Sequence, residues 1–182
     1  RRSQLLHYRR DLQVTDLRGN VDTRLHKLAR RECDAIVLAK AGLDRLGWTN
    51  RITQILPVTV CLPAIGQGAL GIEARQSDEE VCSLLQSLDH ADSRRAIEAE
   101  RALLSALQGG CQVPLGAWAH LEGDRMYLDA CVCSPDGTDY IRERGSGSSA
   151  EPEELGRQTA QKLLQAGAGR ILQLVGRSVA GH

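Results

Sequence analysis

Apolar and polar positions along the first sixty residues follow the pattern of an alternating α/β segment. Leu12–Leu17 is a short strand-like run, Val21–Arg31 places its apolar residues on one helical face, and Ala35–Ala39 is apolar throughout. This order predicts a strand, a helix and a second strand. A run without polar positions fits a parallel sheet covered on both faces. Because two strands do not make a stable sheet, we expect this βαβ unit to join strands that precede Arg1 or come from another chain.

The middle of the chain is predicted to change from helix to a glycine-rich crossover. Residues 43–56 have a helical pattern that ends before Pro57, and Leu62–Ala74 contains three glycines around a strand-like run. Glycine permits positive φ and close approach of the backbone, so we expect a hinge or a ligand-facing crossover here. A short helix is expected from residues 76–80 through Leu88.

The second half carries the pattern of a small α+β domain. Asp92–Leu107 has the apolar period of a helix and stops at Gly109-Gly110, a helix termination signal. Three strand-like runs with turns between them then predict an antiparallel meander, followed by a Gly/Ser loop and two closing helices. These are strands 115–121, 125–133 and 139–144, loop 145–150, and helices 151–166 and 168–175.

The pattern therefore predicts a fold of the α/β plus α+β class in three parts. Residues 1–61 form a partial parallel-sheet module, residues 62–88 a hinge and crossover, and residues 89–182 an α+β domain. The sequence begins without Met inside an apparent helix, which we take as the mark of a truncated or internally started chain.

Composition narrows the function classes. The 23 Lys and Arg residues balance the 23 Asp and Glu residues, so no overall field attracts nucleic acid or an anionic membrane, and any anion site must be local. Aromatic residues make up only 3% of the chain, which leaves few stacking platforms for single-stranded nucleic acid. The sequence shows no apolar signal segment, no run of membrane-spanning length and no Cys-x-x-Cys pair among its six cysteines. We expect a cytoplasmic protein with reduced thiols.

Arg18 and Arg24 flank a predicted transition from strand to helix. Asn20 is a good helix N-cap, and the glycine before it lets the backbone come close to a ligand. Free N–H groups at a helix start, together with two guanidinium groups, favour a carboxylate or a phosphate. The alternative is that both arginines pair with surface carboxylates such as Asp16 and Asp22.

Cys111 differs from the other cysteines because it lies in a predicted turn between a helix end and a strand. A thiol on such a loop is accessible to chemistry, although an inert buried cysteine is the alternative. Cys131 and Cys133 share one strand face and lack the further ligands of a metal site, so we expect them to be packing residues and expect no bound metal. His90 is expected to be a helix-start histidine.

Glu98 and Glu100 lie on different faces of the predicted helix 92–107. Two carboxyl groups on different faces cannot act together on one substrate. We therefore do not expect an acid–base dyad there.

Four segments in this order resemble the signature regions of the porphobilinogen deaminase (hydroxymethylbilane synthase) family. They are Asp16–Leu25, Ala41–Gly47, Leu62–Ala69 and Gly109–Pro114. The resemblance implies a transferase of tetrapyrrole (heme, porphyrin) biosynthesis. Such an enzyme deaminates four porphobilinogens and joins them head to tail on a covalent dipyrromethane primer, releasing hydroxymethylbilane.

The resemblance also implies roles for individual residues. Cys111 would hold the dipyrromethane cofactor through a thioether, and arginines would bind the acetate and propionate arms of the cofactor, of porphobilinogen and of the growing linear pyrrole chain. The matching residues are Arg1, Arg2, Arg18 and Arg24 for the cofactor, and Arg18, Arg24 and Arg45 for the substrate.

The family fold implied by the resemblance has three domains, two of them like periplasmic binding proteins. Residues 1–61 would be a partial second domain, residues 62–88 the crossover belonging to the first domain, and residues 89–182 the third domain with the cofactor cysteine. The family's catalytic aspartate lies in the first domain, and no catalytic residue is identified in this chain. We therefore expect that a missing N-terminal segment is needed for a complete cleft. The alternative is a catalytically inactive fragment or a non-enzymatic carboxylate-binding module.

Overall fold

The protein divides into two compact units, which are described separately. The computed structural model describes residues 1–107 and 114–179, with side chains as far as Val175. The larger unit contains Arg1–Asp11 together with Val58–His182, and the smaller unit is Leu12–Pro57. The chain thus leaves the larger unit after Asp11 and re-enters it at Val58.

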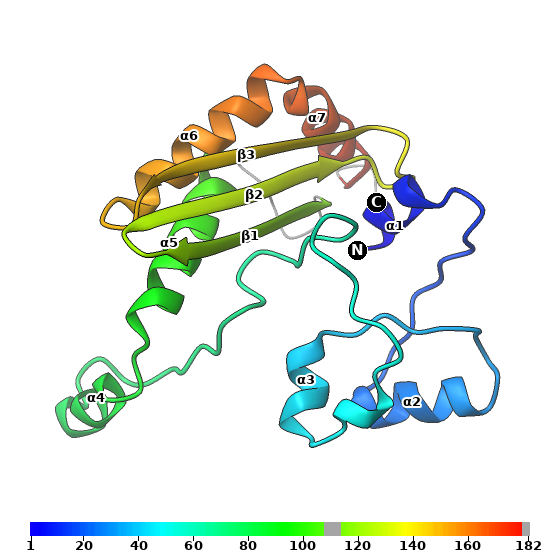
Figure 1. The fold of residues 1–182 in the computed structure, drawn as a ribbon, viewed down its shortest axis with the longest axis horizontal. Coiled ribbons are helices and arrows are strands. Elements are labelled where there is room, and N and C mark those ends of the chain that lie inside the picture. The colour runs from blue at the N-terminus through cyan, green and yellow to red at the C-terminus, as the bar shows by residue number, and fades with distance from the viewer. Residues whose placement is uncertain (108–113, 180–182) are drawn as a thin grey trace. The chain divides into compact units, whose positions relative to one another are not determined.

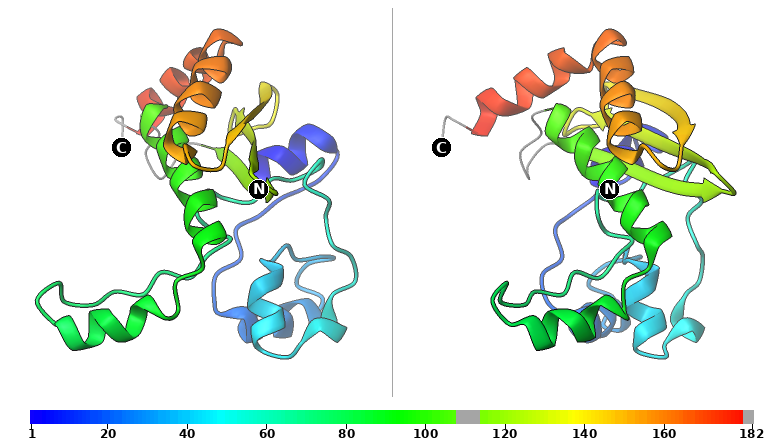
Figure 2. Two further views of the ribbon diagram at one scale, coloured as in Figure 1. Left: turned by 60° about the vertical axis from the view of Figure 1, so that its left-hand side comes forward. Right: turned by 90° about the vertical axis from the view of Figure 1, so that its left-hand side faces the viewer.

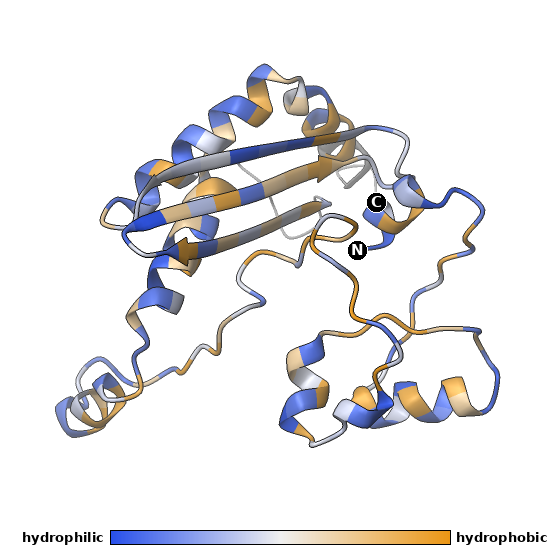
Figure 3. Ribbon diagram, viewed as in Figure 1, coloured by the Kyte–Doolittle hydropathy of each residue, from blue (hydrophilic) through white to orange (hydrophobic). Residues whose placement is uncertain are grey.

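A three-stranded antiparallel sheet organises the larger unit (Figure 1). Its strands are β1 (Leu115–Glu122), β2 (Arg125–Cys133) and β3 (Tyr140–Ser148), in the order β1-β2-β3. The predicted meander is therefore confirmed. Figure 3 shows that β3 is mostly hydrophilic along its middle, whereas β2 is more apolar, as expected for an edge strand beside a central strand.

β3 is longer than the sequence predicted, and the expected loop at residues 145–150 is wrong for residues 145–148, which belong to the strand. Gly145 and Gly147 pair with Leu128 and Met126 of β2. A Cβ atom at Gly145 would lie 2.1 Å from the hydroxyl oxygen of Thr159, so no larger residue fits beneath the covering helix. Gly145 is therefore required by the close packing of a helix on the strand, whereas a Cβ atom at Gly147 would make only ordinary contacts at 3.8 Å.

Three helices cover one face of the sheet (Figure 2). They are α5 (Ala91–Ala106), α6 (Pro152–Gln165) and α7 (Ala168–Val179), and all three confirm predicted helices. Their apolar faces and the sheet enclose the main core, in which Leu103, Leu128 and Leu163 are fully buried. The core depends on close contact between α5 and α6, because a Cβ atom at Gly156 would lie 2.4 Å from the carbonyl oxygen of Ala99.

The short helix α1 (Arg2–Tyr8) also belongs to the larger unit, although most of its partners are far away in the sequence. The amide of Gln4 is buried and exchanges two hydrogen bonds with the backbone of Leu62, at 3.0 and 2.7 Å. Ser3 Oγ donates to the carbonyl of Pro135, and His7 contacts the carbonyl of Gly137. These contacts attach α1 to the β2–β3 turn and to the segment that returns from the smaller unit.

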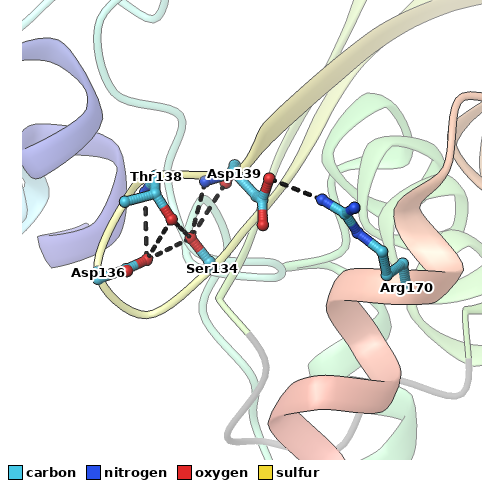
Figure 4. A network of polar contacts seen from close by, with 5 residues as sticks. All are labelled: Ser134, Asp136, Thr138, Asp139 and Arg170. Carbon is cyan, nitrogen blue, oxygen red and sulfur yellow. Dashed lines mark hydrogen bonds and ion pairs between the residues drawn. The ribbon is translucent and has the colours of Figure 1, made fainter.

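The predicted turn between β2 and β3 is held by a network of side chains (Figure 4). Ser134 Oγ accepts the backbone N–H of Asp139 at 2.9 Å and donates to Asp136. The Asp136 carboxylate also accepts from Thr138, and these hydrogen bonds lower the pKa of Asp136. Arg170 of α7 bonds the Asp139 carboxylate at 3.0 Å, so the turn is joined to the helix layer.

The smaller unit contains helices but no strand among its described residues. It consists of α2 (Val21–Ala29), α3 (Lys40–Arg45) and the 3₁₀ turn η1 (Thr49–Arg51). The two predicted strands at 12–17 and 35–39 do not form here, and neither does their parallel sheet. Among the residues that the structure describes, neither segment has a neighbouring strand to pair with, and the side chain of Val37 is 42% exposed.

Two further predictions for the middle of the chain are wrong. The predicted helix over 43–56 is broken, because Gly47 adopts φ +69° and the chain turns there. The strand-like run at 62–74 forms no strand. The short helix before Leu88 is confirmed as α4 (Glu79–Gln86), which Asp78 caps through its carboxylate. Within the described ranges, no helix has the length and apolar character needed to cross a membrane.

Candidate functional site

The start of α2 is built as the sequence predicted. Asn20 Oδ1 accepts the backbone N–H and the hydroxyl of Thr23, each at 2.8 Å, so the N-cap prediction is confirmed. Gly19 has φ +121°, and a Cβ atom there would lie 2.8 Å from the Thr23 methyl carbon. The tight turn into the helix therefore requires glycine.

Three basic residues, Arg18, Arg24 and Lys27, lie around this helix start, and the side chains of Arg24 and Lys27 reach back to the turn before it. Arg24 Nε donates to the carbonyl of Gly19 at 2.8 Å, and Lys27 Nζ donates to the carbonyl of Arg18 at 3.3 Å. The dipole of a helix already places partial positive charge at its N-terminus, so cations there are unfavourable unless an anion joins them. The first turn supplies one carboxylate, Asp22. The cluster is consequently suited to an added anion.

The alternative in which both arginines pair with nearby carboxylates does not describe this structure. Asp22 Oδ2 contacts His26 Nδ1 at 3.3 Å. Within the described part of the chain, neither Arg18 nor Arg24 forms an ion pair with Asp16 or Asp22. With respect to residues 1–107 and 114–179, the guanidinium of Arg18 is available for a ligand, and Arg24 uses only Nε on Gly19, which leaves its terminal nitrogens available.

The structure does not show the side chains of Arg45, Arg1 and Arg2 in contact with the start of α2. Arg45 ends α3, and the start of that helix approaches the start of α2, since a Cβ atom at Gly42 would lie 3.8 Å from a methyl of Val21. Arg45 is exposed. Arg1 and Arg2 are exposed at the start of α1 in the larger unit, so their association with Arg18 and Arg24 stays a prediction.

A hollow of about 320 Å³ lies along α2, beyond the helix start. The sequence did not indicate it, because the residues after Gly47 were assigned to a continuous helix and their turn toward α2 is a tertiary feature. The hollow is lined by Asp22, Leu25, His26, Ala29, Trp48, Asn50 and Arg51.

Cys111 lies outside the described residues, so the structure does not test its predicted role. Its flanks are described: α5 ends at Ala106, and β1 begins at Leu115. Cys131 and Cys133 are fully buried in β2, which confirms them as packing residues, and the hydrogen bond between the two thiols together with burial raises the pKa of Cys133. No group of three or more His, Cys, Asp or Glu side chains within the described residues could hold a metal ion.

Two predictions concern α5: the role of His90 at its start is confirmed, and the role of Glu100 within it was not predicted. His90 caps α5 by accepting the N–H of Ser93 at 3.3 Å, as a helix-start histidine. Glu100 was considered only as a partner for Glu98, yet its side chain is almost fully buried and makes specific contacts. Its position gave the signal, because residue 100 follows Ala96 by one turn and lies on the apolar face of the helix.

Both carboxylate oxygens of Glu100 accept a backbone N–H group. Oε2 accepts from Gly66 at 2.8 Å, and Oε1 accepts from Ala119 of β1 at 3.0 Å. Burial raises the pKa of Glu100, and the two hydrogen bonds oppose that shift only in part. The carboxylate thus joins three segments of the larger unit.

Two family models match the chain. Residues 1–83 match "Porphobilinogen deaminase, dipyromethane cofactor binding domain", and residues 95–165 match "Porphobilinogen deaminase, C-terminal domain". The second match includes the position of Cys111, and the first includes all five predicted arginines.

Curated relatives agree with these matches. The porphobilinogen deaminase of Desulforudis audaxviator (strain MP104C) is 54% identical over 175 residues, 96% of this chain and 57% of the relative. The porphobilinogen deaminase of Pelotomaculum thermopropionicum is 49% identical over 94% of this chain and 55% of the relative. That of Brevibacillus brevis is 50% identical over 94% of this chain and 55% of the relative. The chain therefore spans a little more than half the length of the relatives that it matches.

Proposed function

This chain belongs to the porphobilinogen deaminase family, and from that premise we propose that it is the cofactor-bearing part of a hydroxymethylbilane synthase. The proposed reaction is the stepwise deamination and head-to-tail condensation of four porphobilinogens in tetrapyrrole biosynthesis. The observation that carries the proposal is the cation cluster at the start of α2, which lies within the matched cofactor-binding region.

The charge of the reactants explains why such a cluster is needed. Porphobilinogen carries an acetate and a propionate arm, so each added pyrrole brings two negative charges next to those already bound. Guanidinium groups bind carboxylates through paired hydrogen bonds, and a charge-assisted hydrogen bond contributes about 1.5–3 kcal/mol. Arg18 and Arg24 have donors available for this purpose, and we propose that Arg45, Arg1 and Arg2 complete the site.

We propose Cys111 as the attachment point of the dipyrromethane. When bound, that group would supply the primer to which the pyrroles are added and from which the product is released. The residues of this chain would hold its carboxylate arms and present the thiol on a loop between α5 and β1. An arginine cluster with free donors fits a group of this charge.

The smaller unit contains segments that could pair with strands outside this chain. The segments at 12–17 and 35–39 pair with no strand among the described residues, and Val37 and Ile55 are 42% and 60% exposed. We propose that residues 1–61 complete a parallel sheet of the periplasmic-binding-protein type with a segment outside this chain, which would also provide the catalytic aspartate. Residues 62–88 would form the crossover, and residues 89–182 would form the domain that carries the cofactor. We propose that the protein acts in the cytoplasm.

Intact-protein mass spectrometry tests the proposal most directly. The protein expressed from its full coding sequence is expected to carry the added mass of a dipyrromethane, and peptide mapping is expected to locate that mass on Cys111. Cys111→Ser is expected to abolish both the added mass and product formation, whereas Cys82→Ser, a half-buried cysteine on α4, serves as the control. An active protein with an unmodified Cys111 would refute the assignment, and an unmodified, inactive protein would favour the non-enzymatic carboxylate-binding alternative.

A further inference from the structure

The hollow along α2 lies apart from the cation cluster at the start of that helix. Its volume of about 320 Å³ is within the range of small-molecule sites, which extends from about 300 to 1,000 Å³. Asp22 and His26 line it from one side of α2. Arg24 lies two residues from each of them, a rotation of about 200° around the helix, and so it points away from the hollow. The hollow is therefore a separate site.

The end of α3 positions the second wall of the hollow. Gly47 N–H donates to the carbonyl of Asp44 at 3.0 Å, and Trp48 N–H donates to the carbonyl of Leu43 at 2.9 Å. With Gly47 at φ +69°, these two hydrogen bonds form a Schellman motif, which ends the helix and turns the chain. The 3₁₀ turn η1 follows directly. The turned segment contributes three residues to the lining, namely Trp48, Asn50 and Arg51.

Part of the lining is apolar and suited to a ring. Leu25, Ala29 and Trp48 contribute it, of which Leu25 is buried and Trp48 is half-buried. An indole offers a flat apolar face to another ring, and among the aromatic side chains it is the best partner for a cation. A ligand with an apolar ring would therefore find contact surface on both walls.

The rest of the lining carries charges of opposite sign. Asp22, on α2, keeps its Oδ2 at 3.3 Å from His26 Nδ1, and within residues 1–107 and 114–179 no group binds its Oδ1. Arg51, on η1, forms no ion pair and no side-chain hydrogen bond within those same ranges. The hollow thus presents a carboxylate from one wall and a guanidinium from the other.

We propose that the hollow binds a small amphoteric molecule, a single apolar ring that carries a carboxylate and a primary ammonium group. Arg51 and Asn50 would bind the carboxylate, Asp22 the ammonium group, and Trp48 and Leu25 the ring. A phosphate or a simple carboxylate would meet the like charge of the aspartate, and a simple amine would meet that of the arginine. Two sources of this chemistry are an aromatic amino acid and porphobilinogen. The inference does not depend on the proposed function.

Fluorine NMR of the protein labelled with fluorotryptophan reports on the hollow. The resonance of Trp48 is identified by its loss in Trp48→Phe, and Trp118, in the larger unit, is the internal control. L-phenylalanine is titrated into the protein expressed from its full coding sequence, and porphobilinogen into its Cys111→Ser variant, so that no substrate is consumed. We expect a saturable shift of the Trp48 resonance alone. The ligand that causes it identifies the source.

Variants of the two charged residues test the assigned contacts. Arg51→Gln and Asp22→Asn are each expected to weaken binding about tenfold or more, as the loss of a charge-assisted hydrogen bond predicts. Lys40→Gln and Asp34→Asn remove the same charges from exposed positions outside the hollow and should bind as the wild type does.

Ligand analogues test the same contacts from the other side. Phenylpropanoate lacks the ammonium group, so Asp22→Asn should not weaken its binding. Phenylethylamine lacks the carboxylate, so Arg51→Gln should not weaken its binding. Either loss would assign the ligand's charges to the wrong walls and overturn the inference.

Two further results would contradict the proposed site. A Trp48 resonance that stays fixed with both ligands up to their solubility limits would show that the hollow binds no such molecule. A shift with the same affinity in Arg51→Gln and Asp22→Asn as in the wild type would show that the charges do not select the ligand. A wild-type protein with an unmodified Cys111 would refute the proposed function but would leave this inference intact.

Discussion

Replacing Gly156 by alanine tests whether the packing of α6 on α5 is the main support of the larger unit. A Cβ atom at residue 156 would lie 2.4 Å from the carbonyl oxygen of Ala99, 2.7 Å from Ala102 Cβ and 2.9 Å from the backbone nitrogen of Leu103. Two of these three atoms are backbone atoms of a regular helix, so relief requires α6 to move away from α5. We expect a loss of packing along the whole helix pair.

The magnitude follows from two opposing effects. Overpacking of a core costs up to about 3 kcal/mol, and the contacts here place this site near that limit. Alanine in a helix interior is more favourable than glycine by about 1 kcal/mol. The net expectation is a loss of about 2 kcal/mol, which in a protein of this size lowers the melting temperature by about 4–8 °C.

Tryptophan fluorescence provides a selective assay. The chain has two tryptophans, Trp118 in β1 and Trp48 in the smaller unit. In a Trp48→Phe background only Trp118 reports, so thermal and urea unfolding follow the larger unit. Gly169→Ala in α7 is the control, because its nearest neighbour would be a methyl of Leu164 at an ordinary 3.8 Å, and we expect equal or slightly greater stability. If Gly156→Ala were as stable as Gly169→Ala, the close approach of α5 and α6 would not be a constraint.

Three further perturbations address the site and its support. Arg18→Gln and Arg24→Gln are each expected to weaken binding of porphobilinogen about tenfold or more in titrations. Arg30→Gln, at the other end of α2, is the control and should have no effect. Equal affinities in all three variants would indicate that Arg18 and Arg24 are solvent-exposed surface residues that bind no ligand. Asn20→Ala removes the cap of α2 and should cost that helix about 1 kcal/mol, seen as faster amide exchange confined to its first turn. Because the pKa of Glu100 is raised in the folded state, folding takes up a proton. The stability of the wild type relative to Glu100→Gln should therefore increase as pH falls through the folded pKa toward the unfolded value of 4.5, and this gain should be lost as pH rises. Urea unfolding curves of the two proteins that differ by the same amount at every pH would contradict this prediction.

The part of the fold that could be predicted from the sequence is the part whose partners are close in the chain. The meander and the closing helices have clear turns, and each strand pairs with the one next to it in sequence. The strands at 12–17 and 35–39 have the apolar pattern of a buried sheet, but a pattern cannot provide the neighbouring strands that would pair with them. Gly145 was misread because a glycine required by helix packing looks the same in sequence as a glycine required by a turn.

In the candidate site, too, the features within one segment could be predicted and the contacts between distant segments could not. The cap at Asn20, the tight turn at Gly19 and the cations around them are local to α2, so a single segment of sequence predicted them. The donors to Glu100 lie at Gly66 and Ala119, tens of residues before it and on the strand after it. Sequence reasoning could identify a carboxylate on an apolar helix face, but it could not identify the backbone groups that bind it.

The attachment of α1 has a consequence for the order of events during synthesis. Ser3 and His7 contact Pro135 and Gly137, which follow them by 132 and 130 positions, and Gln4 forms hydrogen bonds with Leu62. Contacts between such distant positions form late, because a long loop must close first. A nascent chain therefore carries α1 without its contacts to Pro135 and Gly137 until the β2–β3 hairpin has emerged, whereas the partner of Gln4 at Leu62 is made earlier. α1 is therefore attached only after residues far beyond it in the chain have been made.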